Sequence, residues 1–258
     1  MASRGSADVC GVGERRRRSG GSIGRVATST APERTARKGP PSILLKTVVA
    51  VTGLFFVFFV LFHMYGNLQI LVGTEAFDEY AHHLRTFGEP MLPEKSFLWV
   101  FRILLLASLV GHVWATMSLW RRAGAARTTR YAGKKKTSYG GFYAKAMRWG
   151  GLALLAFVVF HIMHFTTQTI TIDGAYASPA ERVITSFQVW WVVGIYALAM
   201  VFLGMHLLHG VWGAAMTLGL NTSLKRAEQI RFVSILLATI IVVGFLVPPF
   251  AILFGFIE

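Results

Sequence analysis

Six of the eight histidines lie inside long apolar stretches of the chain, where a titratable side chain is unusual. They are His63, His112, His161, His164, His206 and His209. Because polar groups are expensive in hydrocarbon, an ionisable residue there indicates a functional site. Two opposed imidazoles can ligate a haem iron from its two axial sides. The alternative for a single histidine is a structural hydrogen bond between helices, which is a poor explanation for six.

The apolar stretches predict five transmembrane helices. They run from Ile43 to Val72, Phe97 to Trp120, Met147 to Ile170, Val189 to Leu220 and Phe232 to Ile257. Each reaches or exceeds the roughly 20 residues that an α-helix needs to cross the hydrocarbon core. Helix is the expected state because backbone groups in lipid must bond within their own segment. Only 15% of the residues are charged, well below the share of about 25% in soluble proteins. We therefore expect an all-α membrane protein.

Basic residues alternate between the predicted loops and so indicate the orientation of the chain. Residues 1–41 form a basic arm that we expect to be disordered and cytoplasmic, and residues 42–258 form the transmembrane domain. The second-to-third and fourth-to-fifth loops are basic, whereas the other two loops carry more acidic than basic residues. The positive-inside rule then places the N-terminus in the cytoplasm and the C-terminus outside. The net charge of +14 is thus explained without a nucleic-acid partner.

This orientation sorts the histidines into two layers. The first and third helices run outward, and their histidines lie in the C-terminal half of each helix. They therefore form an outer layer of His63, His161 and His164. The second and fourth helices run inward and give an inner layer of His112, His206 and His209. The layers should lie on the order of 15 Å apart. Since alternate helices of a four-helix bundle can face one another, we expect the first four helices to surround two b-type haems. With Cys10 as its single cysteine, the chain has no Cys-x-x-Cys-His for covalent haem attachment.

Four motifs, one on each of the first four helices, carry a family resemblance. They are Gly53 to Asn67 (GLFFVFFVLFHMYGN), Gly111-His112-Val113-Trp114, Arg148 to His164 (RWGGLALLAFVVFHIMH) and His206 to Trp212 (HLLHGVW). In this order they resemble the five-helix cytochrome b membrane anchors of bacterial succinate dehydrogenases and fumarate reductases, over about residues 43–257. In that family one histidine from each of the first four helices ligates haem. The resemblance implies axial pairs of His63 with His161 and of His112 with His206.

The resemblance also implies partners and a reaction. The partners would be a flavoprotein subunit, which holds FAD and the dicarboxylate site, and an iron–sulfur subunit. This chain would be the membrane-anchor subunit of a succinate:quinone oxidoreductase in the bacterial plasma membrane, passing electrons to quinone, with menaquinone as the expected substrate. The basic loop with Lys134, Lys135 and Lys136 would contact the iron–sulfur subunit and anionic membrane lipid.

Two histidines depart from the family pattern. His164 and His209 each follow another histidine by three residues, on one face of a helix. In one interpretation they hydrogen-bond the ligands or propionates, or carry protons. In the other they bind a metal as alternative or extra ligands, so that a non-haem iron or an iron–sulfur centre displaces at least one haem. A Rieske-type cluster would also need thiolates, and no cysteine lies in these spans.

Several further residues are weaker candidates. Arg102, Arg148 and Lys46 lie near helix ends, where they either pair with haem propionates or extend to the lipid headgroups. Gln168, His82 and His83 could serve a quinone site, although a solvated loop is the better explanation for the last two. Two functions of other classes remain open. One is a cofactor-free anchor for a dehydrogenase, and the other is a histidine-relay transporter, for which the inverted repeats and broken helices are missing.

Overall fold

The computed structural model describes residues 39–126, 138–172 and 176–258, with the side chains of residues 138–146 excepted. Two predictions, the disordered basic arm and the docking of the loop around Lys135, fall on residues outside these ranges.

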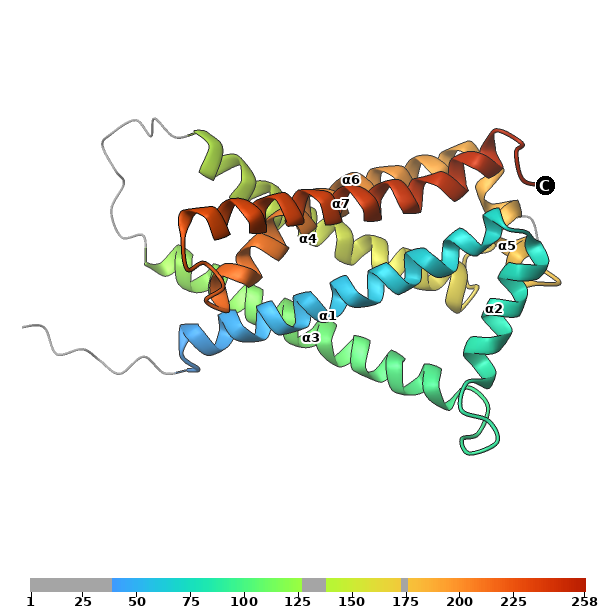
Figure 1. Cartoon of the computed structure of the whole chain (residues 1–258), viewed down its shortest axis with the longest axis horizontal. Helices are drawn as coiled ribbons and strands as arrows, with labels where there is room; N and C mark the ends of the chain where they lie inside the picture. Colours follow the sequence, from blue (N-terminus) through green and yellow to red (C-terminus); the bar gives the residue numbers. More distant parts are fainter. Residues whose placement is uncertain (1–38, 127–137, 173–175) are drawn as a thin grey trace, which may run out of the picture. The chain divides into compact units, whose positions relative to one another are not determined.

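Five helices are long and apolar enough to cross a membrane, which confirms the predicted fold class and a multi-pass membrane protein. They are α1 (Ser42–Leu68), α3 (Ser96–Ala125), α4 (Ser138–His161), α6 (Trp190–Thr217) and α7 (Leu224–Leu253). In Figure 1 all of them extend roughly along the long axis of the view. A 3-10 turn, η1 (Gln69–Leu71), extends α1, and a π-helical turn, η2 (Ile162–Thr166), extends α4.

The predicted start of the fifth helix at Phe232 is wrong. In the structure α7 begins eight residues earlier, at Leu224. The Ser223 side chain accepts a hydrogen bond from the Arg226 N–H at 3.2 Å and so caps the helix start. The hydropathy pattern predicts only where the apolar stretch begins. The helix itself can begin earlier, at a residue that caps its first N–H groups. The basic residues counted as a loop therefore form the first turns of α7.

The connections from α1 to α3 and from α4 to α6 were predicted as loops, but each contains a short helix. They are α2 (Thr74–Thr86) and α5 (Pro179–Phe187), which lie together at one end of the bundle in Figure 1. The buried residues of α5 are Ala180, Val183, Ile184, Ser186 and Phe187. The four apolar residues among them pack into a core cluster with residues of α6 and α7. We call this end of the bundle the outer end, following the predicted orientation.

A carboxylate on α2 caps the start of α5. Asp78 accepts a hydrogen bond from the Ala180 N–H at 2.8 Å. The first N–H groups of a helix have no partner within it, and a negative charge there is favourable. Ser178 caps the same helix by accepting from the Glu181 N–H at 3.2 Å. The two outer-end helices are thus tied to one another by a polar contact.

The contacts between the long helices give their order around the bundle. α1 packs against α3 and α6, and α6 packs against α4. The Arg148 guanidinium of α4 lies 5.3 Å from the centre of the Trp120 ring on α3, which closes the ring of four helices. Consequently α1 is diagonal to α4, and α3 is diagonal to α6. α7 packs on α1 and α6 from outside this ring.

Asp78→Ala should destabilise the outer end because it removes a charged cap from α5. We expect a loss of about 1 kcal/mol in the free energy of unfolding and faster exchange of the Ala180 amide hydrogen. Thermal unfolding in detergent and hydrogen–deuterium exchange would measure the two effects. Glu79→Ala is the matched control, since the neighbouring side chain is exposed. Equal behaviour of the two variants would contradict the cap.

Candidate functional site

The structure brings four histidines together as two pairs on diagonal helices. The ring centroids of His63 on α1 and His161 on α4 are 5.7 Å apart, and those of His112 on α3 and His206 on α6 are 6.3 Å apart. Two imidazoles on opposite sides of one metal ion, each with a metal–nitrogen bond of about 2 Å, hold their centroids roughly 6 to 6.5 Å apart. Both pairs lie close to this separation. We call them the outer pair and the inner pair.

Three helices set the two pairs apart by the same distance. On α1, Gly53 faces an inner-pair imidazole, and His63 of the outer pair follows ten residues later. Gly151 and His161 repeat this arrangement on α4. On α6, Tyr196 contacts the outer pair ten residues before the inner-pair histidine. Ten residues of α-helix rise by about 15 Å, which is the separation that the sequence predicts for the two layers.

A small residue is required where α1 and α4 pass the inner pair. A Cβ added at Gly53 would lie 3.5 Å from His112 Cε1, and one added at Gly151 would lie 3.5 Å from His206 Cε1. A methyl group would just fill these spaces, whereas any longer side chain would displace the imidazole. The two glycines therefore let the imidazoles of His112 and His206 approach the backbones of α1 and α4.

The same pattern, Gly-x5-Phe-x3-His, occurs on both α1 and α4. It comprises Gly53, Phe59 and His63 on α1 and Gly151, Phe157 and His161 on α4. In each case the phenylalanine lies against the histidine one turn later, with ring centroids 5.4 Å apart on α1 and 5.8 Å apart on α4. Each helix is followed by a short outer-end helix and a long returning helix with an inner-pair histidine. The chain thus contains an internal repeat, α1–α3 and α4–α6, whose signal was visible in the sequence but was missed.

A threonine hydroxyl fixes one imidazole of the inner pair. Thr52 Oγ1 donates to the Val48 carbonyl at 2.6 Å and lies 2.9 Å from His112 Nδ1. Since the hydroxyl proton is used, the oxygen accepts from Nδ1–H, which leaves Nε2 unprotonated. Histidine ligands of metals are held in this way. The repeat places Gly150 where α1 has Thr52, and His206 Nδ1 is buried without a hydrogen-bond partner.

The outer pair is held by a string of polar side chains. Tyr196 Oη lies 3.2 Å from His161 Nδ1 and 3.1 Å from His164 Nδ1, and His164 Nε2 lies 3.1 Å from Ser186 Oγ. His164 is only 1% exposed, and both of its ring nitrogens are occupied by hydrogen bonds. In the described part of the chain, the His63 ring nitrogens form no hydrogen bond. Tyr196, Ser186 and Thr52 were not among the predicted site residues.

The predicted helix through to Ile170 is wrong at the position of His164, because the α-helix ends at His161 and a π-helical turn follows. Such turns occur mostly as short insertions and often at functional sites. In a continuous α-helix His161 and His164 would lie on one face. The π-helical turn changes the angle between their side chains. It leaves both imidazoles within reach of the same phenol hydroxyl of Tyr196.

The second additional histidine has different surroundings. His209 lies on an exposed part of α6, whereas the side chain of His206 is partly buried. Across the described ranges, no three side chains among histidine, cysteine, aspartate and glutamate are gathered as a metal site. The donors that do meet are the two imidazole pairs.

The basic candidates lie away from the centre of the bundle. Arg148 packs over Trp120, Arg102 is exposed with its guanidinium 5.1 Å from the Trp99 ring centre, and Lys46 is exposed on α1. These positions are compatible with contacts to headgroups or to a propionate.

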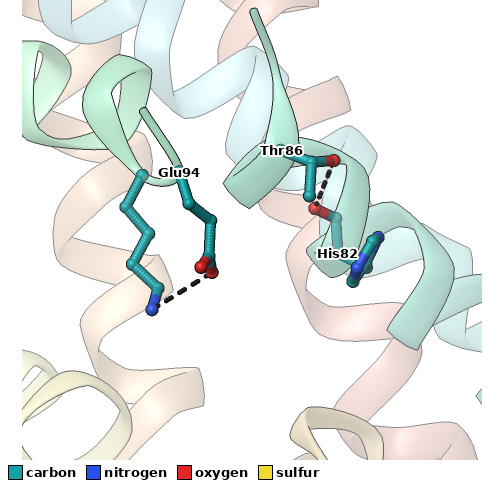
Figure 2. Close-up of polar contacts among 4 residues, drawn as sticks. His82, Thr86 and Glu94 are labelled. Carbon is teal, nitrogen blue, oxygen red and sulfur yellow. Dashed lines mark hydrogen bonds and ion pairs between the residues drawn. The ribbon is translucent and has the colours of Figure 1, made fainter. Parts of the chain in front are cut away.

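The remaining candidates lie near the outer end. His82 and His83 are exposed on α2, where the Thr86 hydroxyl donates to the His82 carbonyl at 3.2 Å (Figure 2). With its amide oriented to satisfy both groups, Gln168 accepts a hydrogen bond from the Arg182 guanidinium at 2.9 Å.

Arg182 of α5 is a residue that the sequence reading counted only as a loop charge. Its guanidinium donates to the Phe165 carbonyl at 2.9 Å. Burial lowers the pKa of Arg182, the nearby Tyr176 raises it, and Arg85 lowers it. The cation therefore holds the π-helical turn of α4 against α5.

Comparisons of the chain with protein-family models, with curated proteins and with solved structures found no match. The function is therefore inferred from the residues and geometry of the chain itself.

Gly150→Thr should give His206 the partner that Thr52 gives His112. A Cβ at Gly150 would make an ordinary van der Waals contact with Phe202 Cδ1, at 3.6 Å, so the first atom of the side chain fits. We expect the free energy of unfolding to rise by about 1 kcal/mol relative to Gly150→Val, because a buried nitrogen gains a hydrogen bond. Denaturation in detergent would measure the difference between these two variants of equal shape. A valine variant that is as stable as the threonine variant would refute the repeat-based assignment.

Proposed function

We propose that the chain is the cytochrome b-type membrane anchor of a succinate:quinone oxidoreductase, with His63 and His161 holding one b-type haem and His112 and His206 holding a second. The observation that carries the proposal is the presence of two opposed imidazole pairs, on diagonal membrane-crossing helices and about 15 Å apart along the helix axes. Haem in such sites supplies one-electron chemistry, and the expected path of the electrons leads from an iron–sulfur subunit to quinone.

The donor set supports haem over other metal centres. Each pair offers two imidazoles, which is what a six-coordinate haem iron needs beyond its macrocycle. A structural zinc site would need four protein ligands. His206 Nδ1 lies against α4 beside Gly151, as His112 Nδ1 lies against α1 beside Gly53, so Nε2 is the nitrogen that each ring of the inner pair offers to a bound group.

The aromatic side chains around the pairs support one-electron transfer through an apolar part of the bundle. Phe59 stacks on His63 with an interplanar angle of 11°, and the Phe56 ring centroid lies 5.8 Å from that of His112. These apolar rings exclude water from the ligands and occupy the part of α1 between the two pairs. Two centres about 15 Å apart would cover half of the roughly 30 Å of hydrocarbon.

The motif order supports the assignment to succinate chemistry. The four matched motifs resemble those of complex II anchors, and the four pair-forming histidines lie within them. The dicarboxylate reaction belongs to the flavoprotein partner, so this chain contributes ligands, spacing and a quinone-reactive surface. Whether the complex runs toward succinate oxidation or fumarate reduction depends on that partner and on the quinone.

Haem content tests the proposal directly. The full chain, purified in detergent from haem-replete cells, should show a dithionite-reduced α-band of bis-imidazole type and two haems per chain. His63→Ala or His161→Ala should each reduce this to one haem by removing an outer ligand, and His112→Ala or His206→Ala should remove the inner haem.

Histidines outside the two pairs supply the controls. His209→Ala changes an exposed residue three positions from His206, and His82→Ala changes an exposed residue on α2, so both variants should retain two haems. A wild-type chain with iron and acid-labile sulfide but no haem would support an iron–sulfur centre instead. A chain with neither cofactor would leave the anchor and the transporter functions.

The succinate assignment has a separate test. A tagged chain purified from native membranes should carry a flavoprotein and an iron–sulfur protein, and succinate should reduce its haem. Malonate, a dicarboxylate that competes with succinate, should block that reduction. Haem that dithionite reduces but succinate does not would overturn the succinate assignment while leaving the haem ligands in place.

A further inference from the structure

We propose that Tyr196 is the positioning residue of the outer pair, because it fixes which nitrogen of His161 faces His63. This inference rests on the proposed function for its redox consequence, although the hydrogen-bond geometry stands by itself. A phenol hydroxyl has one proton, so it can donate to only one of the two imidazole nitrogens that it contacts and must accept from the other. The protonation of His161 and that of His164 are thereby linked through a single oxygen.

The hydrogen bonds of the string can run in two directions, and only one of them leaves His161 Nε2 free to bind a metal ion. When Ser186 Oγ accepts from His164 Nε2–H, the Nδ1 atom of His164 is unprotonated and accepts the Tyr196 proton. The Tyr196 oxygen then accepts from His161 Nδ1–H. This leaves His161 Nε2 with its lone pair free. In the reverse arrangement Nε2 would carry the proton, and that nitrogen could not bind a metal ion.

Aromatic packing holds the phenol in this place. The ring centroids of Phe157 and Phe187 both lie 5.0 Å from that of Tyr196, and Phe165 lies at 5.9 Å. The first two meet the phenol edge to face, with interplanar angles of 85° and 86°. Such packing restricts the phenol ring, so its hydroxyl remains between the two histidines. Ser186, at the end of the string, is fully buried on α5.

The inner pair has a different device at the equivalent place. There the Thr52 hydroxyl accepts a hydrogen bond from His112 and donates one to the Val48 carbonyl of its own helix. The outer pair instead depends on a side chain from α6 and a serine from α5. The redox properties of the two centres should therefore respond to different substitutions.

Tyr196→Phe removes the hydroxyl and keeps the ring, so it tests the positioning role. A hydrogen bond from Nδ1–H makes an imidazole a stronger donor to the metal, which stabilises ferric iron. We expect the midpoint potential of the outer centre alone to shift upward, together with a change in one of the two low-spin ferric EPR signals, at unchanged haem content. Thr52→Val should shift the inner centre alone, in the same direction. Tyr65→Phe, an exposed tyrosine on α1, should shift neither.

A second variant and a second measurement keep the proposal testable if Tyr196→Phe does not fold. Ser186→Ala acts at the far end of the string and should produce a smaller upward shift of the same centre. In ¹⁵N-histidine solid-state NMR, wild-type His161 should be the Nδ1–H tautomer, and Tyr196→Phe should lose that hydrogen-bonded signal. This readout needs no haem, so a haem-free chain would refute the proposed function alone. Unchanged potentials or equal shifts at both centres, with an unchanged His161 tautomer, would overturn the role of Tyr196.

Discussion

A buried imidazole presents two ring nitrogens, and in hydrocarbon there is no water to satisfy either of them. The site follows from how the chain meets this constraint. His164 has both nitrogens satisfied by protein hydroxyls, while His112 and His161 have one each. Within the described ranges, His63 and the Nδ1 atom of His206 have none. The unsatisfied capacity of these buried imidazoles thus lies on members of the two pairs, whereas His164, outside the pairs, has none left.

The long helices and the pairing of the histidines could be predicted from the sequence for simple reasons. Apolar length determines which segments can cross a membrane, and a fixed rise per residue converts position along a helix into depth. The diagonal placement of α1 with α4 then follows from alternating direction. These arguments needed no side-chain contact, which is why they gave the pairs but could say nothing about how each imidazole is oriented.

The orienting groups could not be predicted because their roles depend on tertiary contacts. Tyr196 on a long apolar helix reads as packing until two histidines are found against its hydroxyl, and Thr52 reads as an ordinary helix residue that bonds back to its own carbonyl. α5 was missed because it is short and amphipathic and lies in a segment with few charges. The equal i, i+3 spacing of the two additional histidines hid a difference, since the π-helical turn buries His164 while the regular α6 leaves His209 exposed.

The internal repeat has a consequence for how this protein is made. Each pair takes one histidine from α1–α3 and one from α4–α6, so neither half contains two ligands for the same centre. A nascent chain with only its first two spans in the bilayer would offer single, weakly held imidazoles at both depths. The outer pair would have both of its imidazoles once α4 is inserted, whereas the inner pair also needs α6. The two pairs are therefore completed in order along the chain, and a product truncated between α4 and α6 would have the outer pair but only His112 of the inner pair.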